Sequence, residues 1–224
     1  MHLKKHTTYF DNMSGEPTVF IVDSCSDMRK SVHWLFESVS TQVESYSNAN
    51  DFLRDYDPKR SGCLILDVRI PGMSGLELQR SLNKITSRLS IIFVTGHSNV
   101  PTAVRAMRQG AVDFFEKPVD EQVLLERVQQ ELRNISKEEH NRRGMAEYIS
   151  GLKHLSKREL EVMSHLTEGK SAKEIARDLG ISPRTVEVHR TRILTKTGAG
   201  TVSKLIVMAR RYQSLGNILI KHDT

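Results

Sequence analysis

The chain has 224 residues, a formal net charge of +6, and 38% apolar and 27% charged residues, which is an ordinary balance for a globular protein. This length accommodates two small domains, each with its own core. No run approaches the ~18 consecutive apolar residues of a membrane-spanning helix, and the polar N-terminus lacks the apolar segment of a signal peptide. We therefore expect a cytoplasmic protein with no membrane partner, a flexible leader at residues 1–16, and two reduced cysteines.

The positive charge is concentrated in the last third of the chain. From residue 150 onward there are fourteen Lys and Arg against seven Asp and Glu, whereas residues 1–149 hold nineteen against twenty. A basic module joined to a near-neutral one indicates a nucleic-acid binder with a separate control domain. A well-solvated surface would give the same balance, so the charge alone leaves both interpretations open.

Residues 17–135 alternate short apolar runs with helical patterns. This alternation predicts an α/β domain in which a five-stranded parallel sheet carries helices on both faces. Two of the expected strands are apolar at nearly every position, as is typical of strands buried on both sides. Ser74 and Glu77 have the spacing of a capping box. The expected strands cover 18–22, 43–46, 63–67, 91–95 and 112–116, and the expected helices cover about 27–38, 49–56, 75–85, 100–109 and 119 onward.

Helical spacing of apolar residues continues to Ile135, and a polar stretch follows. We place the domain junction at residues 136–151, and the sequence leaves open whether they form a loose linker or continue the helix. Residues 152–224 contain only helix signals and predict an all-α domain of four helices. These signals are the capping boxes Ser156–Glu159 and Ser171–Glu174, the helix-stopping Gly169 and Gly180, the Ser182–Pro183 start, and a last helix from about Thr201.

The carboxyl ends of the expected strands carry polar groups. Asp23 follows the first strand, Asp67 and Thr95 end the third and fourth, and Lys117 follows the fifth. In an open parallel sheet these ends share one edge, which is where such folds place their chemistry. The set fits phosphoryl transfer to a carboxylate, with Asp67 as the nucleophile, a hard divalent cation held by carboxylates, and Lys117 paired with the phosphoryl group.

The segments LILDVRIPGMSGLEL, VTGH and DFFEKPV resemble the motifs of a CheY-like receiver domain over about residues 17–132. The resemblance implies the strand order 2-1-3-4-5 and a Mg²⁺ ion bound beside the phosphoacceptor. It implies that Asp67 is phosphorylated, that Thr95, Phe114 and Lys117 are the switch and phosphate-contacting residues, and that the Mg²⁺ ligands are Asp23, Asp67 and the backbone carbonyl of Arg69.

The pocket departs from the receiver pattern at Ser24. Receivers end the first strand with two acidic residues, the second of which is a Mg²⁺ ligand, whereas this chain reads Asp23-Ser24. Because the number of charged ligands tunes the affinity for a hard cation, we expect Mg²⁺ to bind weakly. Asp27, four residues on from Asp23, could supply the missing carboxylate, although its place at the start of the first helix favours a cap.

A helical projection of residues 183–198 separates two faces. Val186, His189 and Ile193 are expected to pack inward, and the opposite face mixes arginine, valine and threonine in a way that suits the major groove of DNA. Ser171 and Lys173 begin the preceding helix, where they could meet phosphates. The predicted DNA-binding residues are Ser171, Lys173, Arg184, Thr185, Glu187, Val188, Arg190, Thr191 and Arg192.

The segment LSKRELEVMSHLTEGKSAKEIARDLGISPRTVEVHRTRI resembles a LuxR-type helix-turn-helix over about residues 152–214. A receiver joined to this module is the arrangement of NarL/FixJ-type two-component response regulators, and this sequence is more similar to the FixJ side. The resemblance implies a transcription factor rather than an enzyme. Its implied partners are a sensor histidine kinase, promoter DNA, RNA polymerase and a second copy of the chain.

Two alternatives keep part of this interpretation. The first is an atypical regulator that binds DNA without phosphorylation, because Ser24 weakens the metal site. The second is an aspartate-dependent phosphohydrolase. Such enzymes place a second acid two residues after the nucleophile, and Arg69 at that position counts against turnover. A sigma-factor-like module or an RNA-binding output explains the C-terminal part alone.

Overall fold

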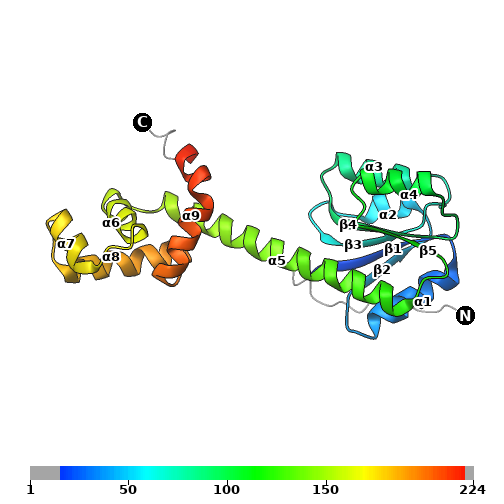
Figure 1. Cartoon of the computed structure of the whole chain (residues 1–224), viewed down its shortest axis with the longest axis horizontal. Helices are drawn as coiled ribbons and strands as arrows, with labels where there is room; N and C mark the ends of the chain where they lie inside the picture. Colours follow the sequence, from blue (N-terminus) through cyan, green and yellow to red (C-terminus); the bar gives the residue numbers. More distant parts are fainter. Residues whose placement is uncertain (1–15, 220–224) are drawn as a thin grey trace, which may run out of the picture. The chain divides into compact units, whose positions relative to one another are not determined.

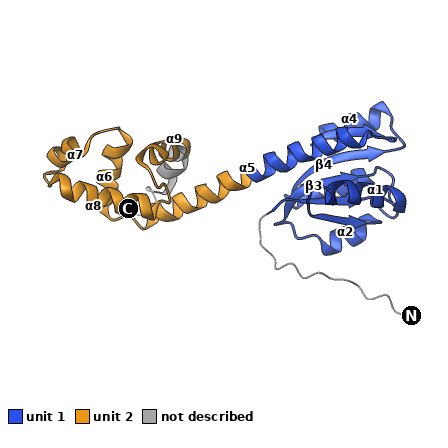
Figure 2. Ribbon diagram, turned by 90° about the horizontal axis from the view of Figure 1, so that it is seen from below, with its two compact units in different colours: residues 1–137 blue, residues 138–224 orange. Residues whose placement is uncertain are grey.

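The structure, a computed structural model, describes residues 16–219. It divides into two compact units, residues 1–137 and 138–224, which are coloured separately in Figure 2. The expected leader, residues 1–16, lies outside the described residues apart from Glu16. Within residues 16–219, none of the helices is both long enough and apolar enough to cross a bilayer.

The first unit is built on a parallel sheet of five strands in the order β2-β1-β3-β4-β5, as predicted. Strands β3 and β4 begin a few residues earlier than the sequence suggested. In the extended part of β3, Gly62 lies opposite Thr18, where a Cβ would come within 1.9 Å of the Thr18 carbonyl oxygen. The strands are β1 Thr18–Val22, β2 Val43–Tyr46, β3 Ser61–Leu66, β4 Arg88–Thr95 and β5 Asp113–Glu116.

Helices cover both faces of this sheet (Figure 1). On one face, Phe20 and Phe93 of the sheet pack with α2, α3 and α4 in one core. On the other face, Ile21 and Val94 pack with α1 and α5 in a second core. Residues alternate between the two cores along each strand because successive side chains point to opposite faces. The helices are α1 Ser26–Glu37, α2 Ala49–Asp55, α3 Gly75–Lys84, α4 Val100–Arg108 and α5 Glu121–Lys153.

The helix α5 is 33 residues long and contains the whole of the expected junction, residues 136–151. The boundary between the two units, after Lys137, falls inside it. The last α5 residue that packs in the core beside the sheet is Leu132; after the buried Ile135, the next buried side chain along the helix is Tyr148, which belongs to the core of the second unit. The polar residues between them are mostly strong helix formers, so the segment stays helical without packing into either core.

The second unit is helical and its helix ends follow the predicted signals. Complete capping boxes begin α6 at Ser156 and α7 at Ser171, and the Ser182 side chain caps α8. Gly180 ends α7 in the left-handed conformation, with φ of 65°. One core holds the unit together, with Val162, Ile175, Val186, Ile193 and Leu205 fully buried. The helices are α6 Lys157–Thr167, α7 Ala172–Leu179, α8 Pro183–Lys196 and α9 Val202–Leu219.

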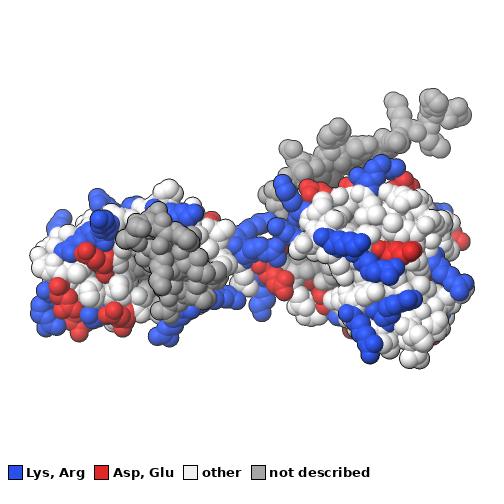
Figure 3. All heavy atoms as spheres, turned by 90° about the horizontal axis from the view of Figure 1, so that it is seen from above, with Lys and Arg blue, Asp and Glu red and all other residues white. Residues whose placement is uncertain are grey.

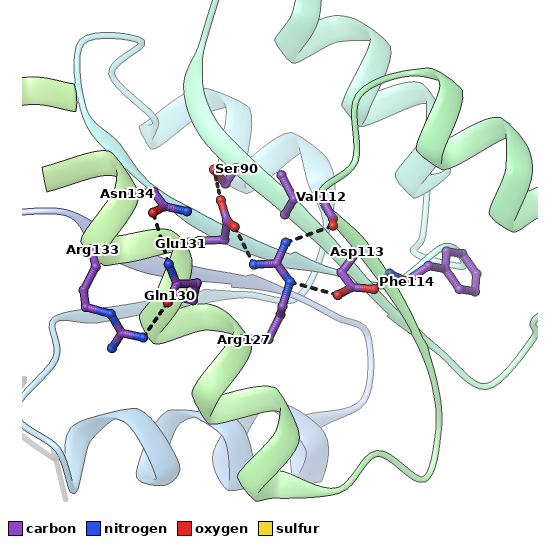
Figure 4. A network of polar contacts seen from close by, with 9 residues as sticks. All are labelled: Ser90, Val112, Asp113, Phe114, Arg127, Gln130, Glu131, Arg133 and Asn134. Atoms are coloured by element: carbon purple, nitrogen blue, oxygen red, sulfur yellow. Dashed lines mark hydrogen bonds and ion pairs between the residues drawn. The ribbon is translucent and has the colours of Figure 1, made fainter. Parts of the chain in front are cut away.

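A polar network that the sequence did not predict joins α5 to the sheet (Figure 4). The Arg127 guanidinium pairs with Asp113 and Glu131 and donates to the Val112 carbonyl oxygen at 3.0 Å. The other Glu131 oxygen accepts from Ser90 Oγ at 3.1 Å. Helix α5 is therefore fixed to the starts of β4 and β5 by hydrogen bonds as well as by apolar packing.

Candidate phosphoacceptor pocket and DNA-binding face

The backbone ladder of the sheet continues one residue past β1, β3 and β5. The amide of Asp23 donates to Tyr46 O at 3.2 Å, that of Asp67 donates to Val22 O at 3.0 Å, and that of Lys117 donates to Thr95 O at 2.9 Å. These bonds hold the first residue after each strand in line with the sheet. The side chains of Asp23, Asp67 and Lys117 therefore meet at one edge, as the sequence predicted.

The Lys117 ammonium lies between the two carboxylates. Its Nζ donates to Asp23 Oδ2 at 2.5 Å and to Asp67 Oδ2 at 3.0 Å. Both acidic side chains are nearly buried, with 5% and 11% of their surface exposed. Burial by itself would lower the pKa of Lys117, but the hydrogen bonds that it donates to the two carboxylates outweigh burial and raise the pKa. The amine is therefore a fixed positive charge in the pocket.

The remaining oxygen of each carboxylate accepts from the backbone amide two residues on. Cys25 N donates to Asp23 Oδ1 at 2.8 Å, and Arg69 N donates to Asp67 Oδ1 at 3.1 Å. Gly75, at the start of α3, lies against the backbone of Asp67, where a Cβ would come within 2.2 Å of the Asp67 carbonyl oxygen. This close approach explains the glycine eight residues after the aspartate.

The Thr95 hydroxyl lies at the same edge on a fully buried residue and accepts from His97 N at 3.3 Å. The loop that follows leads directly into α4, whose N-cap is Asn99. Phe114, in β5, is partly buried, and its ring lies 5.9 Å from that of Phe93. Both predicted switch residues are thus placed on strands next to the pocket.

Two residues that follow β1 closely, Ser24 and Asp27, do not join Asp23 and Asp67 in the pocket. Ser24 is exposed, and its hydroxyl is the group that stands where a second carboxylate was expected from the receiver pattern. The interpretation of Asp27 as a helix cap is wrong. Helix α1 begins at Ser26 with Cys25 as its N-cap, which makes no side-chain cap, and Asp27 lies inside the first turn.

Helix α8 has the two faces that the projection predicted. Val186 and Ile193 are fully buried and His189 is partly buried on the same side. The outer face is exposed and includes Val188, an apolar side chain that is 46% exposed among polar neighbours. The other exposed residues of this face are Arg184, Glu187, Thr191, Arg192 and Thr195.

Hydrogen bonds already occupy several polar groups of this face. The hydroxyls of Thr191 and Thr195 donate to carbonyl oxygens one turn earlier, at 3.0 Å each, so each threonine turns an acceptor lone pair and a methyl outward. Arg190 pairs with Glu187 at 3.3 Å. The Thr185 hydroxyl bonds to the capping Ser182 at 2.8 Å.

At the start of α7, the two predicted phosphate-contacting residues differ in whether their polar groups are already hydrogen-bonded within the chain. The Ser171 amide and hydroxyl both donate to the Glu174 carboxylate, at 2.8 and 2.7 Å. Lys173 is exposed on the first turn. The helix therefore already carries an anion at its N-terminus, and Lys173 is the group there that can meet a phosphate through its charge.

Comparison with known proteins gives matches to both units. The family of response regulator receiver domains matches residues 19–129, and the luxR family of bacterial regulatory proteins matches residues 153–209. The transcriptional regulatory protein FixJ of Azorhizobium caulinodans is 39% identical over 85% of this chain and 90% of its own. The response regulator protein TmoT of Ectopseudomonas mendocina is 37% identical over 88% of this chain and 89% of its own. The chain belongs to the FixJ-type response regulators.

Solved structures of such regulators cover most of the chain. The response regulator StyR is 36% identical, with a TM-score of 0.69, and the match covers 88% of this chain and 100% of StyR. Full-length FixJ from B. japonicum is 34% identical, with a TM-score of 0.53 over 90% of this chain and 99% of that one. In a FixJ-type regulator the receiver implies a histidine kinase as partner, and the luxR-type domain implies binding to DNA.

Receiver domains generally bind Mg²⁺ at the phosphorylation site, and the groups present here suit a hard cation. Asp23 and Asp67 offer carboxylate oxygens and Arg69 offers a backbone carbonyl, a set compatible with Mg²⁺ because this ion keeps several waters and needs only one or two carboxylates. Within residues 16–219, however, no group of three or more Asp, Glu, His or Cys side chains is arranged to hold a metal ion. The acidic side chains of this pocket that lie beside Lys117 are Asp23 and Asp67.

Charge on the surface is less localised than the sequence count suggested. On the face drawn in Figure 3, Lys and Arg side chains are spread over both units rather than gathered into one patch. On the described part of α8, basic residues alternate with Glu187 and with uncharged residues. The candidate interface of this regulator is therefore defined by the mixed character of the α8 face rather than by density of charge.

Proposed function

We propose that the chain is a phosphorylation-switched transcription factor in which Asp67 accepts a phosphoryl group from a sensor histidine kinase. The observation that carries this proposal is the position of Lys117 Nζ, within hydrogen-bonding distance of both Asp23 and Asp67. A partly buried amine held between two carboxylates supplies the positive charge that a new phosphoryl group needs. Asp67 is assigned as the nucleophile because it occupies the phosphoacceptor position of the receiver motif, and its side chain keeps 11% of its surface exposed.

During transfer, the residues of the chain orient the nucleophile and receive its new charge. The Arg69 amide fixes Asp67 Oδ1, which leaves Oδ2 to attack the phosphorus of the kinase's phosphohistidine, while the bond from phosphorus to the histidine nitrogen breaks and the imidazole leaves. Lys117 then shifts its hydrogen bond from the carboxylate to a phosphoryl oxygen. A Mg²⁺ ion held by Asp23, Asp67 and the Arg69 carbonyl would neutralise charge on the phosphoryl oxygens.

The signal leaves the pocket through Thr95 and α4. A phosphoryl group on Asp67 offers acceptors that draw the Thr95 hydroxyl away from His97 N, and the loop so displaced leads into α4. Helix α4 exposes an apolar stripe of Val100, Val104 and Met107 at 76%, 42% and 45% exposure, spaced so that they share one face. We assign this stripe to pairing with a second copy of the chain in the phosphorylated state.

The dimer presents two copies of α8 to promoter DNA. Arg184 and Arg192 can read guanine, the exposed Val188 can contact a thymine methyl, and Thr191 offers a methyl and an acceptor. Lys173 meets a backbone phosphate. RNA polymerase is the downstream partner in this proposal, which the likeness to FixJ, a transcriptional regulatory protein, supports.

The proposal is tested by incubating the purified protein with acetyl phosphate and Mg²⁺ and recording its intact mass, beside an Asp67→Ala variant. We expect the native protein to gain one phosphoryl group and the variant to gain none. Analytical ultracentrifugation of the same samples should show dimers in the phosphorylated protein alone. A phosphoryl gain that persists in Asp67→Ala would overturn the assignment of the acceptor.

A second candidate function is DNA binding that is independent of phosphorylation, and the observation that favours it is Ser24 in place of a charged metal ligand. Under this alternative, Asp67→Ala binds promoter DNA as tightly as the native protein treated with acetyl phosphate. Calorimetric titration with Mg²⁺ addresses the metal site directly. Ser24→Asp should bind Mg²⁺ about tenfold more tightly than the native protein, because it restores a charged ligand.

A further inference from the structure

The C-terminal turn of α8 is held by residues at the end of α5 and the start of α6. Lys196 Nζ donates to His154 O at 3.0 Å and to Glu159 Oε2 at 2.7 Å. Glu159 is almost completely buried. At the backbone of the same turn, Gly151 of α5 lies against the Lys196 carbonyl oxygen, and a Cβ at position 151 would come within 2.1 Å of it. The side chain and the main chain of Lys196 are therefore both fixed.

Gly151 has no conformational reason to be glycine. It lies in the regular part of α5, where glycine costs about 1 kcal/mol relative to alanine. The same helix contains Gly144, where a Cβ would meet nothing within 4 Å. The two glycines therefore differ in one respect, which is that Gly151 lies in backbone contact with α8.

The inner side of α8 also packs against α5. Tyr148 is buried in the core that contains Val186 and Ile193, and Leu152 packs against that core. The last two turns of α5 thus contribute to the support of the inward face of α8, while Gly151 and Lys196 fix its C-terminal end. A helix with one face supported in this way presents its opposite face in one defined position.

We propose that Gly151 and Lys196 are positioning residues for DNA recognition, which place the reading face of α8 through the end of α5. The inference rests on the proposed function only in that α8 reads duplex DNA. It gives α5 a role beyond connecting the two units, because the helix that begins at Glu121 ends in backbone contact with the recognition helix. Neither residue needs to touch a base for its loss to weaken specific binding.

The test compares Gly151→Ala with Gly144→Ala in the full-length chain. Its probes are a duplex enriched from a random library by the native protein and a scrambled duplex of the same length and composition. We expect Gly151→Ala to lose roughly tenfold in affinity for the enriched duplex, the order of one base contact, and to bind the scrambled duplex unchanged. Gly144→Ala should match the native protein on both.

Lys196→Met provides a second and independent variant. It removes the hydrogen bonds to His154 and Glu159 but keeps an apolar stem. A positioning role predicts a lower affinity for the enriched duplex alone, with the salt dependence of binding unchanged. Loss of a phosphate contact would instead lower the affinity for both duplexes alike and reduce the salt slope by about one.

The proposal is overturned if either variant, shown to be helical by circular dichroism, keeps the native ratio of affinities for the two duplexes. If Gly151→Ala fails to fold, Lys196→Met decides the outcome by the ratio and the salt slope. Failure of the proposed function looks different, because the native protein would then enrich no sequence from the library.

Discussion

Arg127 Nε lies 2.9 Å from Asp113 Oδ2 and so links α5 to the first residue of β5 (Figure 4). The Asp113 carboxylate also accepts from the amide of Phe114, at 2.8 Å from its other oxygen. One carboxylate therefore contacts both α5 and the backbone of the predicted switch aromatic. Any rearrangement of β5 around Phe114 must be accommodated by this ion pair or break it.

Arg127→Met should destabilise the first unit by about 2 kcal/mol, because it leaves the nearly buried Glu131 and the partly exposed Asp113 without their cation. Hydrogen exchange of the β4 amides reports the first unit alone and measures the change. Arg133→Met is the matched control, since Arg133 is exposed on the same helix and bonds to the exposed Gln130. Equal protection in both variants would contradict a stabilising role for the network.

The pH dependence of the second unit should depend on Glu159. Its hydrogen bond from Lys196 overcomes burial and, with help from Ser156, lowers the pKa of Glu159 from 4.5 to about 2. Because the folded pKa is depressed, the stabilisation is complete above pH 4.5 and is lost as the pH falls from there towards 2. We expect the free energy of unfolding of the native protein to exceed that of Glu159→Gln by about 2 kcal/mol at pH 7. This difference should shrink as the pH falls below 4.5.

Urea unfolding of the two proteins at several pH values gives this difference directly, because the contributions of the titrating groups that they share cancel in the comparison. Glu161→Gln removes a charge from an exposed position of the same helix and serves as the control. A native advantage that stayed constant down to pH 3 would show that the Glu159 carboxylate is not the group responsible.

Substitutions on and beside α8 should separate base reading from phosphate contact. Arg184→Ala is expected to cost about 1–3 kcal/mol on an enriched duplex and little on a scrambled one. Lys173→Ala should weaken both alike and lower the salt slope by about one. Fluorescence anisotropy at two salt concentrations measures both effects, with the exposed Arg177 changed to Ala as a matched loss of charge. Equal losses on the two duplexes for Arg184→Ala would exclude a base contact.

The two cysteines should react very differently with iodoacetamide. Cys25 is exposed, whereas Cys63 is completely buried in β3, and burial raises the pKa of its thiol far above the usual range. We expect one alkylation in the folded protein and two in urea, counted by intact mass. A Cys25→Ser variant that still gained one group when folded would show that β3 opens to solvent.

The alternation of apolar runs predicted all five strands, because strands buried on both faces leave a strong sequence pattern, and the resemblance to receiver domains supplied their order. The same pattern placed Asp23, Asp67 and Lys117 at one edge, since parallel strands end together. The structure confirmed this convergence. The functional roles of these residues remain predictions until phosphorylation is measured.

Contacts between segments far apart in the chain were not predictable in this way. The spacing of Arg127 and Glu131 indicates a pair on one helix turn, but nothing in the sequence points to Ser90 or Asp113 as their partners. Gly151 likewise looks like an ordinary helix-weakening glycine until the Lys196 carbonyl is seen beside it. The helix start at Ser26 was mistaken by one residue because its N-cap, Cys25, carries no capping side chain.

Between Ile135 and Tyr148, helix α5 places no fully buried side chain in either core. Recombination within this segment would therefore exchange whole receivers for one another without disturbing the packing of the output domain. Chimeric regulators joined near Gly144 should fold, because a junction there cuts through neither of the cores to which α5 contributes. The segment thus offers an engineering site for attaching new input signals to the same DNA-binding module.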